Sequence, residues 1–253
     1  MSRNKFLAAI FIAFIFLAIT VSYFGYYHHI HQYDAMIVRV ASKYDLDPVL
    51  VRSIIYEESY FKKDARSSAG AIGLMQVTPI IVKEWTRVTS QADLNKAFPN
   101  PSEKRSKKKR LTEEELLAYP EINLQLGCWY LDQLMKRYNE LEDPLPIVLA
   151  GYNAGPSNAQ RWQQLTRNKK IAKNTYRELY IRQIDFPETK RYVNNILTRY
   201  KNDNFLIKIK TCTLALLQTY TLSLVQHNPR NEHPKFIFIL NDFSNSNKLK
   251  QLS

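Results

Sequence analysis

Two adjacent glutamates, Glu57 and Glu58, stand near the end of a helical pattern and are the first candidates for chemistry. On a helix that turns about 100° per residue, one apolar stripe is formed by Leu50, Val51, Ile54 and Ile55. Glu58 projects from the centre of that stripe, whereas Glu57 lies at its edge. Glu58 is therefore the carboxyl group that we expect to be directed at the core.

A carboxyl group in an apolar environment has a raised pKa, because burial disfavours its charged form. Glu58 then has two interpretations. It is either a structural acid that pairs with an arginine or reaches water, or a general acid that still carries a proton near neutral pH. The motifs elsewhere in the chain bear on this choice.

Four of the six glycines fall in two short clusters, at residues 67–79 and 150–156. Glycine permits a tight turn or a close approach of the backbone to a ligand. Neither cluster has the spacing of a phosphate-binding loop, and no lysine stands where such a loop needs one. Each cluster taken alone is also consistent with a turn that binds nothing.

Other catalytic groups are scarce in the middle of the chain. The histidines all lie near the ends, at His28, His29, His31, His227 and His233. Without a central imidazole we expect neither a catalytic triad nor a zinc site. The two cysteines, Cys128 and Cys212, are too few and too distant for a disulfide framework, although one structural disulfide between them stays open. We expect no metal and no cofactor.

Helical periodicity dominates the elements that must position these residues. Asp34 is expected to cap one helix, and Asp47 followed by Pro48 is typical of the start of a second that runs to about Tyr60. Further helical patterns cover residues 121–138 and 187–200. No two-residue alternation occurs before residue 200, so the sequence predicts a mainly α domain.

Five short motifs occur in a fixed order along this domain. They are Glu58-Ser59-x-Phe61, the glycine-containing segment 67–79, Glu121-Ile122-Asn123-x-x-x-Gly127-x-x-Tyr130-Leu131, Tyr152-Asn153-Ala154-Gly155 and Glu188-Thr189-x-x-Tyr192-Val193. Their types and order resemble the catalytic domain of the soluble-type lytic transglycosylases. The resemblance covers residues 33–201.

The resemblance implies a lysozyme-like helical fold that cleaves the bond between N-acetylmuramic acid and N-acetylglucosamine in peptidoglycan and forms a 1,6-anhydromuramic acid end. Glu58 matches the sole catalytic acid. The substrate-binding positions of the family are matched by Ser67, Gln76, Tyr152, Asn153, Glu188 and Tyr192. Thr78 differs from the methionine of some members, and the basic loop 104–110 looks like an insertion. The preferred strand length, endo or exo cleavage and protein partners stay open.

Two other functions remain open for the same motifs. A lysozyme-type hydrolase would use this fold with water as the acceptor, and a wall-binding scaffold would keep the fold without needing the acid. The intact Glu58-Ser59 pair argues against the scaffold.

The N-terminal segment indicates a membrane anchor. Residues 6–27 contain no charged side chain, and about twenty apolar residues suffice to span a bilayer as a helix. Arg3 and Lys5 precede the segment, which predicts a cytoplasmic N-terminus and an exported domain. The alternative is a cleaved signal peptide, for which Thr20-Val21-Ser22 is only a weak site. We expect a single-pass protein of the inner membrane that faces the periplasm or the cell exterior.

The sequence thus predicts three parts: an anchor or signal at 1–27, a catalytic domain at 33–201 and a tail of unknown role at 205–253. The formal net charge is +13, which suits an anionic partner. Because the domain is expected to be exported, we expect no nucleic-acid partner. The expected partners are peptidoglycan strands and, through the N-terminal helix, membrane lipid. Residues 211–225 are apolar but short for a second span.

Overall fold

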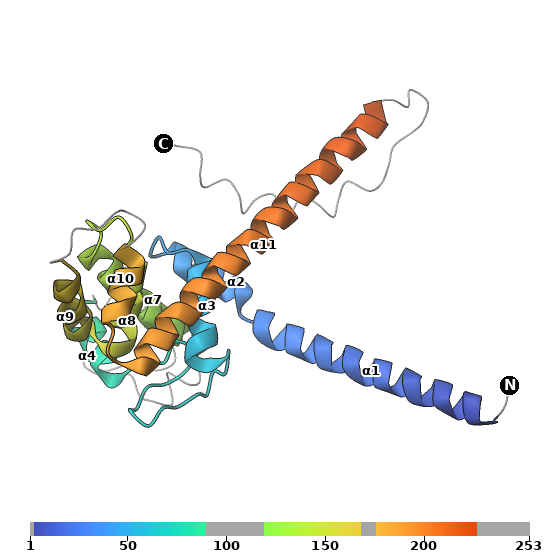
Figure 1. Ribbon diagram of the computed structural model, residues 1–253, viewed down its shortest axis with the longest axis horizontal. Coiled ribbons are helices and arrows are strands. Elements are labelled where there is room, and N and C mark those ends of the chain that lie inside the picture. The colour runs from blue at the N-terminus through green and yellow to red at the C-terminus, as the bar shows by residue number, and fades with distance from the viewer. Residues whose placement is uncertain (1–2, 90–118, 168–175, 227–253) are drawn as a thin grey trace, which may run out of the picture. The chain divides into compact units, whose positions relative to one another are not determined.

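Helices account for the regular structure of the chain in the computed structural model, which describes residues 3–89, 119–167 and 176–226. In chain order these helices are α1 (Arg3–His31), α2 (Asp34–Ser42), α3 (Pro48–Ser59), α4 (Pro79–Val88), α7 (Pro120–Arg137), α8 (Leu145–Ala154), α9 (Pro156–Arg167), α10 (Tyr176–Gln183) and α11 (Pro187–Gln226) (Figure 1). Within those residues there is no strand, and only isolated bridges join Ile72 to Arg66 and to Val77. The mainly α prediction is confirmed, while the basic loop 104–110 lies outside the described residues.

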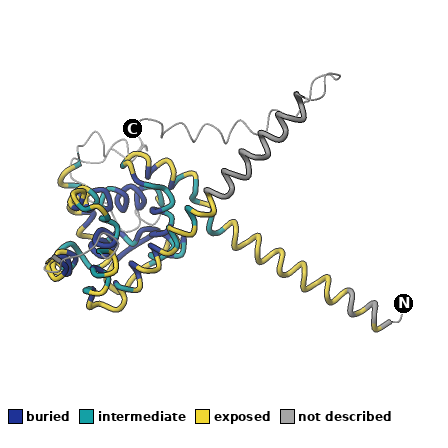
Figure 2. Tube along the Cα trace, turned by 45° about the horizontal axis from the view of Figure 1, so that its top comes forward, coloured by how far each residue is buried: buried dark blue, intermediate teal, exposed yellow. Residues whose placement is uncertain are grey.

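Helix α7 is packed between other helices of the domain. It contacts α2, α4 and α8, and α8 in turn contacts α9 and α10. Its fully buried side chains include Leu124, Leu126 and Leu131, each with no exposed surface. Figure 2 shows this distribution, with the buried residues gathered in the helical domain and α1 exposed over its described length up to His28.

The start of α3 follows from its sequence. The Asp47 carboxylate accepts a hydrogen bond of 2.8 Å from the backbone N–H of Val49, and Pro48 is the first helical residue. Both features are as predicted, because an N-cap carboxylate satisfies a backbone donor that has no partner inside the helix. Asp47 also accepts a bond of 2.7 Å from the hydroxyl of Tyr200 in α11. The same residue therefore starts α3 and holds α11 against it.

One expectation about the first helices is wrong. Asp34 does not cap α2, because Tyr33 holds the N-cap position and the Asp34 carboxylate instead bonds Arg52 and His31. The polar residues after the apolar run belong to α1, which continues to His31. Arg52 donates to the carbonyl of Ile30, which satisfies an acceptor that the end of a helix leaves open.

The chain divides into two compact units, Met1–Asn204 and Phe205–Ser253. Helix α11 runs through this boundary and ends at Gln226, well beyond the predicted end near residue 200. The sequence offers no reason for it to stop earlier, because residues 188–228 contain neither glycine nor proline. Cys128 is a buried free thiol, so the disulfide with Cys212 is not formed.

Candidate active site

Glu58 lies in the last turn of α3, next to the buried side chains of the apolar stripe. Its carboxyl oxygen Oε1 accepts a hydrogen bond of 2.6 Å from the hydroxyl of Tyr192 in α11. Tyr192 is only 6 % exposed, whereas Glu58 keeps part of its surface open. The carboxyl group is thus held by one buried phenol and remains partly accessible from outside.

The surroundings of Glu58 favour its protonated form. Burial of the carboxyl group raises its pKa to about 7; the hydrogen bond from Tyr192 opposes this rise, and the negative charge of Glu57 adds to it. A carboxyl group with this pKa is protonated in a large fraction of molecules near neutral pH, and it can release or take up a proton there. The structure therefore supports the general-acid interpretation of Glu58.

Two tyrosines, Tyr152 and Tyr192, lie close to this carboxyl group. Burial raises the pKa of both Tyr152 and Tyr192 well above the ordinary range, and the charge of Glu58 adds to the rise. Both phenols are therefore neutral hydrogen-bond donors at physiological pH. Tyr192 donates to Glu58, and Tyr152 donates to the backbone oxygen of Met75 at 2.8 Å.

Met75 belongs to the loop of residues 71–77, which Asn123 clamps from the core. The side-chain amide of Asn123 donates to the carbonyl of Ile72 at 2.7 Å and accepts from the backbone N–H of Met75 at 2.9 Å. Gly73 lies at a φ of +79°, and a Cβ there would come within 2.4 Å of the Asn123 amide nitrogen. Only glycine fits this combination of a left-handed backbone and a close side chain.

The same loop is tied directly to the end of α3. The buried hydroxyl of Ser59 donates to the carbonyl of Leu74 at 2.8 Å. Gly127 of α7 lets Met75 approach, since a Cβ at Gly127 would lie 2.5 Å from the Met75 sulfur. Glu58 and the 71–77 loop are therefore held in one arrangement by buried contacts.

Gln76 and Ser67 form hydrogen bonds with the backbone of this loop and of the turn before it. The Gln76 amide donates to the carbonyls of Gly73 at 3.0 Å and Ala65 at 3.3 Å, and the residue has a positive φ of 46°. The Ser67 hydroxyl accepts from the backbone N–H of Ala71 at 3.0 Å. Both predicted site residues thus support the local backbone in this structure.

Asn153 and Glu188 lie where α8 ends and α11 begins. Asn153 accepts a hydrogen bond of 2.7 Å from the buried hydroxyl of Thr189, which joins the two helices. Glu188 is exposed in the first turn of α11, four residues before Tyr192, so both project from one side of that helix. Among the described residues Ser67, Asn153 and Glu188 make no hydrogen bond with Glu58, whereas Tyr192 does.

Three residues that position the site were not among the predicted site residues. Ser59, Asn123 and Thr189 all stand inside the sequence motifs, but their roles depend on which backbone groups they meet. The sequence did carry a signal for these three residues, because each is a small polar residue inside a motif. Where such a side chain is buried, it needs a hydrogen-bond partner. Among the described residues, no three His, Cys, Asp or Glu side chains are close enough to hold a metal ion.

Comparison with known proteins agrees with this geometry. The model of the transglycosylase SLT domain family matches residues 35–175. The chain is 26 % identical over 193 residues to the membrane-bound lytic murein transglycosylase F of Desulfosudis oleivorans, covering 69 % of this chain and 37 % of that protein. It is 25 % identical over 165 residues to the soluble lytic murein transglycosylase of Salmonella typhimurium, covering 65 % and 22 %. The chain thus spans well under half the length of these relatives.

The fold has a counterpart among solved structures. The 70 kDa soluble lytic transglycosylase of Escherichia coli superposes with a TM-score of 0.52 at 24 % identity, over 69 % of this chain and 24 % of that one. This likeness confirms the lysozyme-like helical fold.

Proposed function

Because the chain belongs to the transglycosylase SLT domain family, we propose that it is a peptidoglycan lytic transglycosylase and that Glu58 is its catalytic acid. The observation that carries this proposal is the Glu58 carboxyl group, whose pKa burial raises to about 7 and which accepts a bond of 2.6 Å from Tyr192. The names of the relatives, which are lytic murein transglycosylases, support the substrate.

The proposed reaction uses one carboxyl group twice. Protonated Glu58 gives its proton to the oxygen between N-acetylmuramic acid and N-acetylglucosamine, so the bond from C1 of the muramic acid to that oxygen breaks. The N-acetyl group of the muramic acid assists the departure, as it does in the substrate-assisted glycosidases. Ionised Glu58 then accepts the proton of the muramyl C6 hydroxyl while its oxygen bonds to C1. Glu58 is protonated again, and no water is consumed.

The Tyr192 hydrogen bond fits both halves of this cycle. It leaves the second carboxyl oxygen to carry the proton in the acid step, and it stabilises the carboxylate that forms after proton transfer, because hydrogen bonds to an ionised group are the stronger ones. Gln76, Tyr152, Asn153, Glu188 and Ser67 are proposed to bind or orient the strand. The present bonds of Ser67, Gln76 and Tyr152 hold the backbone of the loop beside Glu58, and Asn153 joins α8 to α11.

The products decide between a transglycosylase and a hydrolase. We expect purified sacculi treated with the protein to release muropeptides that end in 1,6-anhydromuramic acid, lighter by one water than the products of a lysozyme, because the C6 hydroxyl closes the reaction. Mass spectrometry of the soluble fragments measures this. Reducing muramic acid ends as the main product would place the protein among the hydrolases, and intact sacculi would favour a binding scaffold.

The N-terminal helix supports a membrane location. Helix α1 is long and apolar enough to cross a membrane, and its described apolar side chains between Leu7 and Tyr27 are exposed. We propose that it anchors the protein in the inner membrane with the N-terminus inside and the catalytic domain on the periplasmic or outer side, following the charges of Arg3 and Lys5.

A topology experiment tests this location. We expect a reporter enzyme that works only outside the cytoplasm to be active when fused after Asn204, and the unfused protein to stay with membranes after high-salt and alkaline washes. The same reporter fused before Arg3 should be inactive. A soluble mature protein that begins near Tyr23 would instead show a cleaved signal peptide.

The proposed catalytic domain, residues 33–201, can be tested by truncation. We expect the chain that ends after Asn204 to remain folded and to cut sacculi at close to the full-length rate. The contacts that hold α11 on the domain, such as the bond from Tyr200 to Asp47, lie upstream of the cut. Thermal unfolding and muropeptide release measure the outcome. An unfolded or inactive truncation would show that the tail belongs to the catalytic fold.

A further inference from the structure

Helix α11 carries apolar residues out of the catalytic unit. Phe205, Leu206 and Ile207 follow the last residue of that unit, Asn204, and they are 63 %, 53 % and 47 % exposed. The helix goes on to Gln226. Phe205 and Leu206 together expose apolar surface at the start of an apolar helical segment, and such a surface is typical of a membrane or protein contact.

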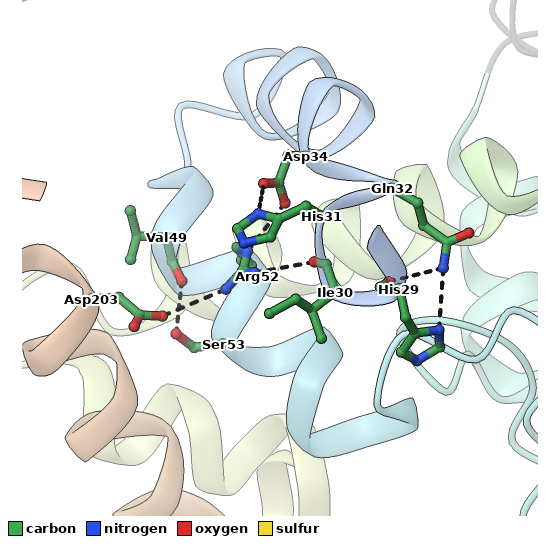
Figure 3. A network of polar contacts seen from close by, with 9 residues as sticks. All are labelled: His29, Ile30, His31, Gln32, Asp34, Val49, Arg52, Ser53 and Asp203. Atoms are coloured by element: carbon green, nitrogen blue, oxygen red, sulfur yellow. Dashed lines mark hydrogen bonds and ion pairs between the residues drawn. The ribbon is translucent and has the colours of Figure 1, made fainter. Parts of the chain in front are cut away.

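The point where this segment leaves the catalytic unit is also where α1 ends. We define a polar junction by Arg52, Ile30, Asp34 and Asp203 (Figure 3). From α3, the Arg52 guanidinium donates to the carbonyl of Ile30 at 3.1 Å and to Asp34 at 3.1 Å, and it pairs with Asp203 at 3.7 Å. The last turn of α1 and the residue two positions before Phe205 are thus held by one side chain.

A second contact strengthens the hold on α1. A ring nitrogen of His29 lies 2.7 Å from the carbonyl of Tyr60, which ends α3. The neighbouring aromatic residues of α1 are exposed, as a membrane-interface belt would be. They are Tyr23, Phe24, Tyr26 and Tyr27. If α1 is the anchor, the bilayer surface begins within one or two helical turns of the polar junction.

The sequence of the outgoing segment suits that surface. Between Phe205 and Gln226 the only charged residues are Lys208 and Lys210, and lysines beside an apolar segment favour anionic lipid headgroups. The uncharged run of residues 211–226 would be about 24 Å long as a helix. That is shorter than the hydrocarbon core of about 30 Å, so the segment is suited to entering one leaflet and not to crossing the membrane.

We propose that residues 205–226 form a second, non-spanning membrane contact, which enters the leaflet that faces the catalytic domain. The proposal rests on the membrane anchor proposed above, but not on the catalytic activity. Together with the polar junction, it would attach the domain to the bilayer at two points. The catalytic domain would then keep one side towards the membrane while it acts on the wall.

The chain contains its own probe for this contact. Cys212 falls inside the segment, whereas the other cysteine, Cys128, is buried, and burial raises the pKa of its thiol to about 12, so it reacts slowly. The full-length protein is placed in nanodiscs of phosphatidylethanolamine and phosphatidylglycerol, whose two faces are both open to solvent. Before this reconstitution the protein is labelled in detergent with a nitroxide methanethiosulfonate reagent. Electron paramagnetic resonance then measures how often the nitroxide collides with oxygen, which concentrates in lipid, and with a nickel chelate, which stays in water.

We expect the ratio of oxygen collisions to chelate collisions to be at least about tenfold higher for a nitroxide on Cys212 than for the control position, because lipid dissolves oxygen and excludes the polar chelate. A double variant, Cys212→Ser with Ser157→Cys, is the matched control. Position 157 is exposed on α9, so a nitroxide there should collide readily with the water-soluble chelate. The single Cys212→Ser variant should lose the signal.

Each other result overturns the proposal. Frequent collision of the Cys212 nitroxide with the chelate would place the segment in water. Rare collision with both oxygen and the chelate would show that it is buried against protein. A protein that fails to enter nanodiscs at all would overturn the α1 anchor together with this contact, whereas the muropeptide experiment tests the catalytic proposal independently.

Discussion

Replacing Glu58 with glutamine is expected to lower the rate of sacculus cleavage by about 10²- to 10⁴-fold, the usual contribution of a positioned general acid. Glutamine keeps the shape of the side chain, and its amide oxygen can still accept the bond that Tyr192 donates to Glu58. It has no acidic proton to give to the leaving oxygen. Release of soluble muropeptides from sacculi, followed over time, measures the loss.

Glu57 provides the matched control for this experiment. It is the adjacent glutamate, it accepts a bond of 2.7 Å from the side chain of Asn195, and it makes no bond with Tyr192 among the described residues. Glu57→Gln should therefore retain activity within a few-fold of the wild type. Equal losses in the two variants, or a fully active Glu58→Gln variant, would reject Glu58 as the single catalytic acid.

The raised pKa of Glu58 also sets the dependence on pH. Activity of the wild type should fall as pH rises through about 7, since the proton needed for the first step is lost there. The folded protein holds this proton more tightly than the unfolded chain, whose carboxyl group titrates near 4.5. Stability therefore decreases as pH rises from about 4.5 to about 7.

Glu58→Gln removes that pH-dependent cost. At pH 8 the variant should be more stable than the wild type by about 1–3 kcal/mol, a range that allows for the partial exposure of the side chain. At pH 4 the carboxyl group is protonated in both the folded and the unfolded state, so the difference should nearly vanish. Urea unfolding at the two pH values measures this, and a gain that does not depend on pH would contradict the assignment of the raised pKa.

Asn123→Ala should destabilise the fold far more than a substitution at Glu57 or Glu58. The residue is fully buried, and its amide bonds both Ile72 and Met75. Removing it leaves the backbone N–H of Met75 unpaired in the core, takes one of two donors from the Ile72 carbonyl, which Val77 still bonds, and opens a cavity. Together these changes cost about 2–4 kcal/mol. The 71–77 loop would also lose its clamp, so cleavage activity should fall even at temperatures where the variant stays folded.

Asn194→Ala is the control for that substitution. Asn194 is exposed on α11 and bonds only the carbonyl of Lys190 one turn earlier among the described contacts. Its loss should change the free energy of unfolding by about 0.5 kcal/mol or less. The urea midpoints of the two variants can be compared directly. Similar midpoints would show that Asn123 is not the clamp of the loop.

The local features of the fold could be read from the sequence because they depend on neighbouring residues. Asp47 and Pro48 predict the start of α3 through the partnerless N–H groups at a helix end. The apolar spacing around Ile54 predicts which side of α3 is buried and singles out Glu58 from Glu57. Asp34 is the counterexample, since a distant residue, Arg52, competes for the carboxylate that would otherwise cap α2.

The sequence by itself therefore determined the helical class, the order of the motifs and the choice of Glu58. Only the tertiary structure decided which groups meet. Tyr192 reaches Glu58 across 134 positions of chain, and Asn123 reaches Met75 across 48. The physical reason is that such bonds depend on how α7 and α11 pack against α3 and on the space that Gly73 and Gly127 leave open. No periodicity or spacing within one segment contains that information.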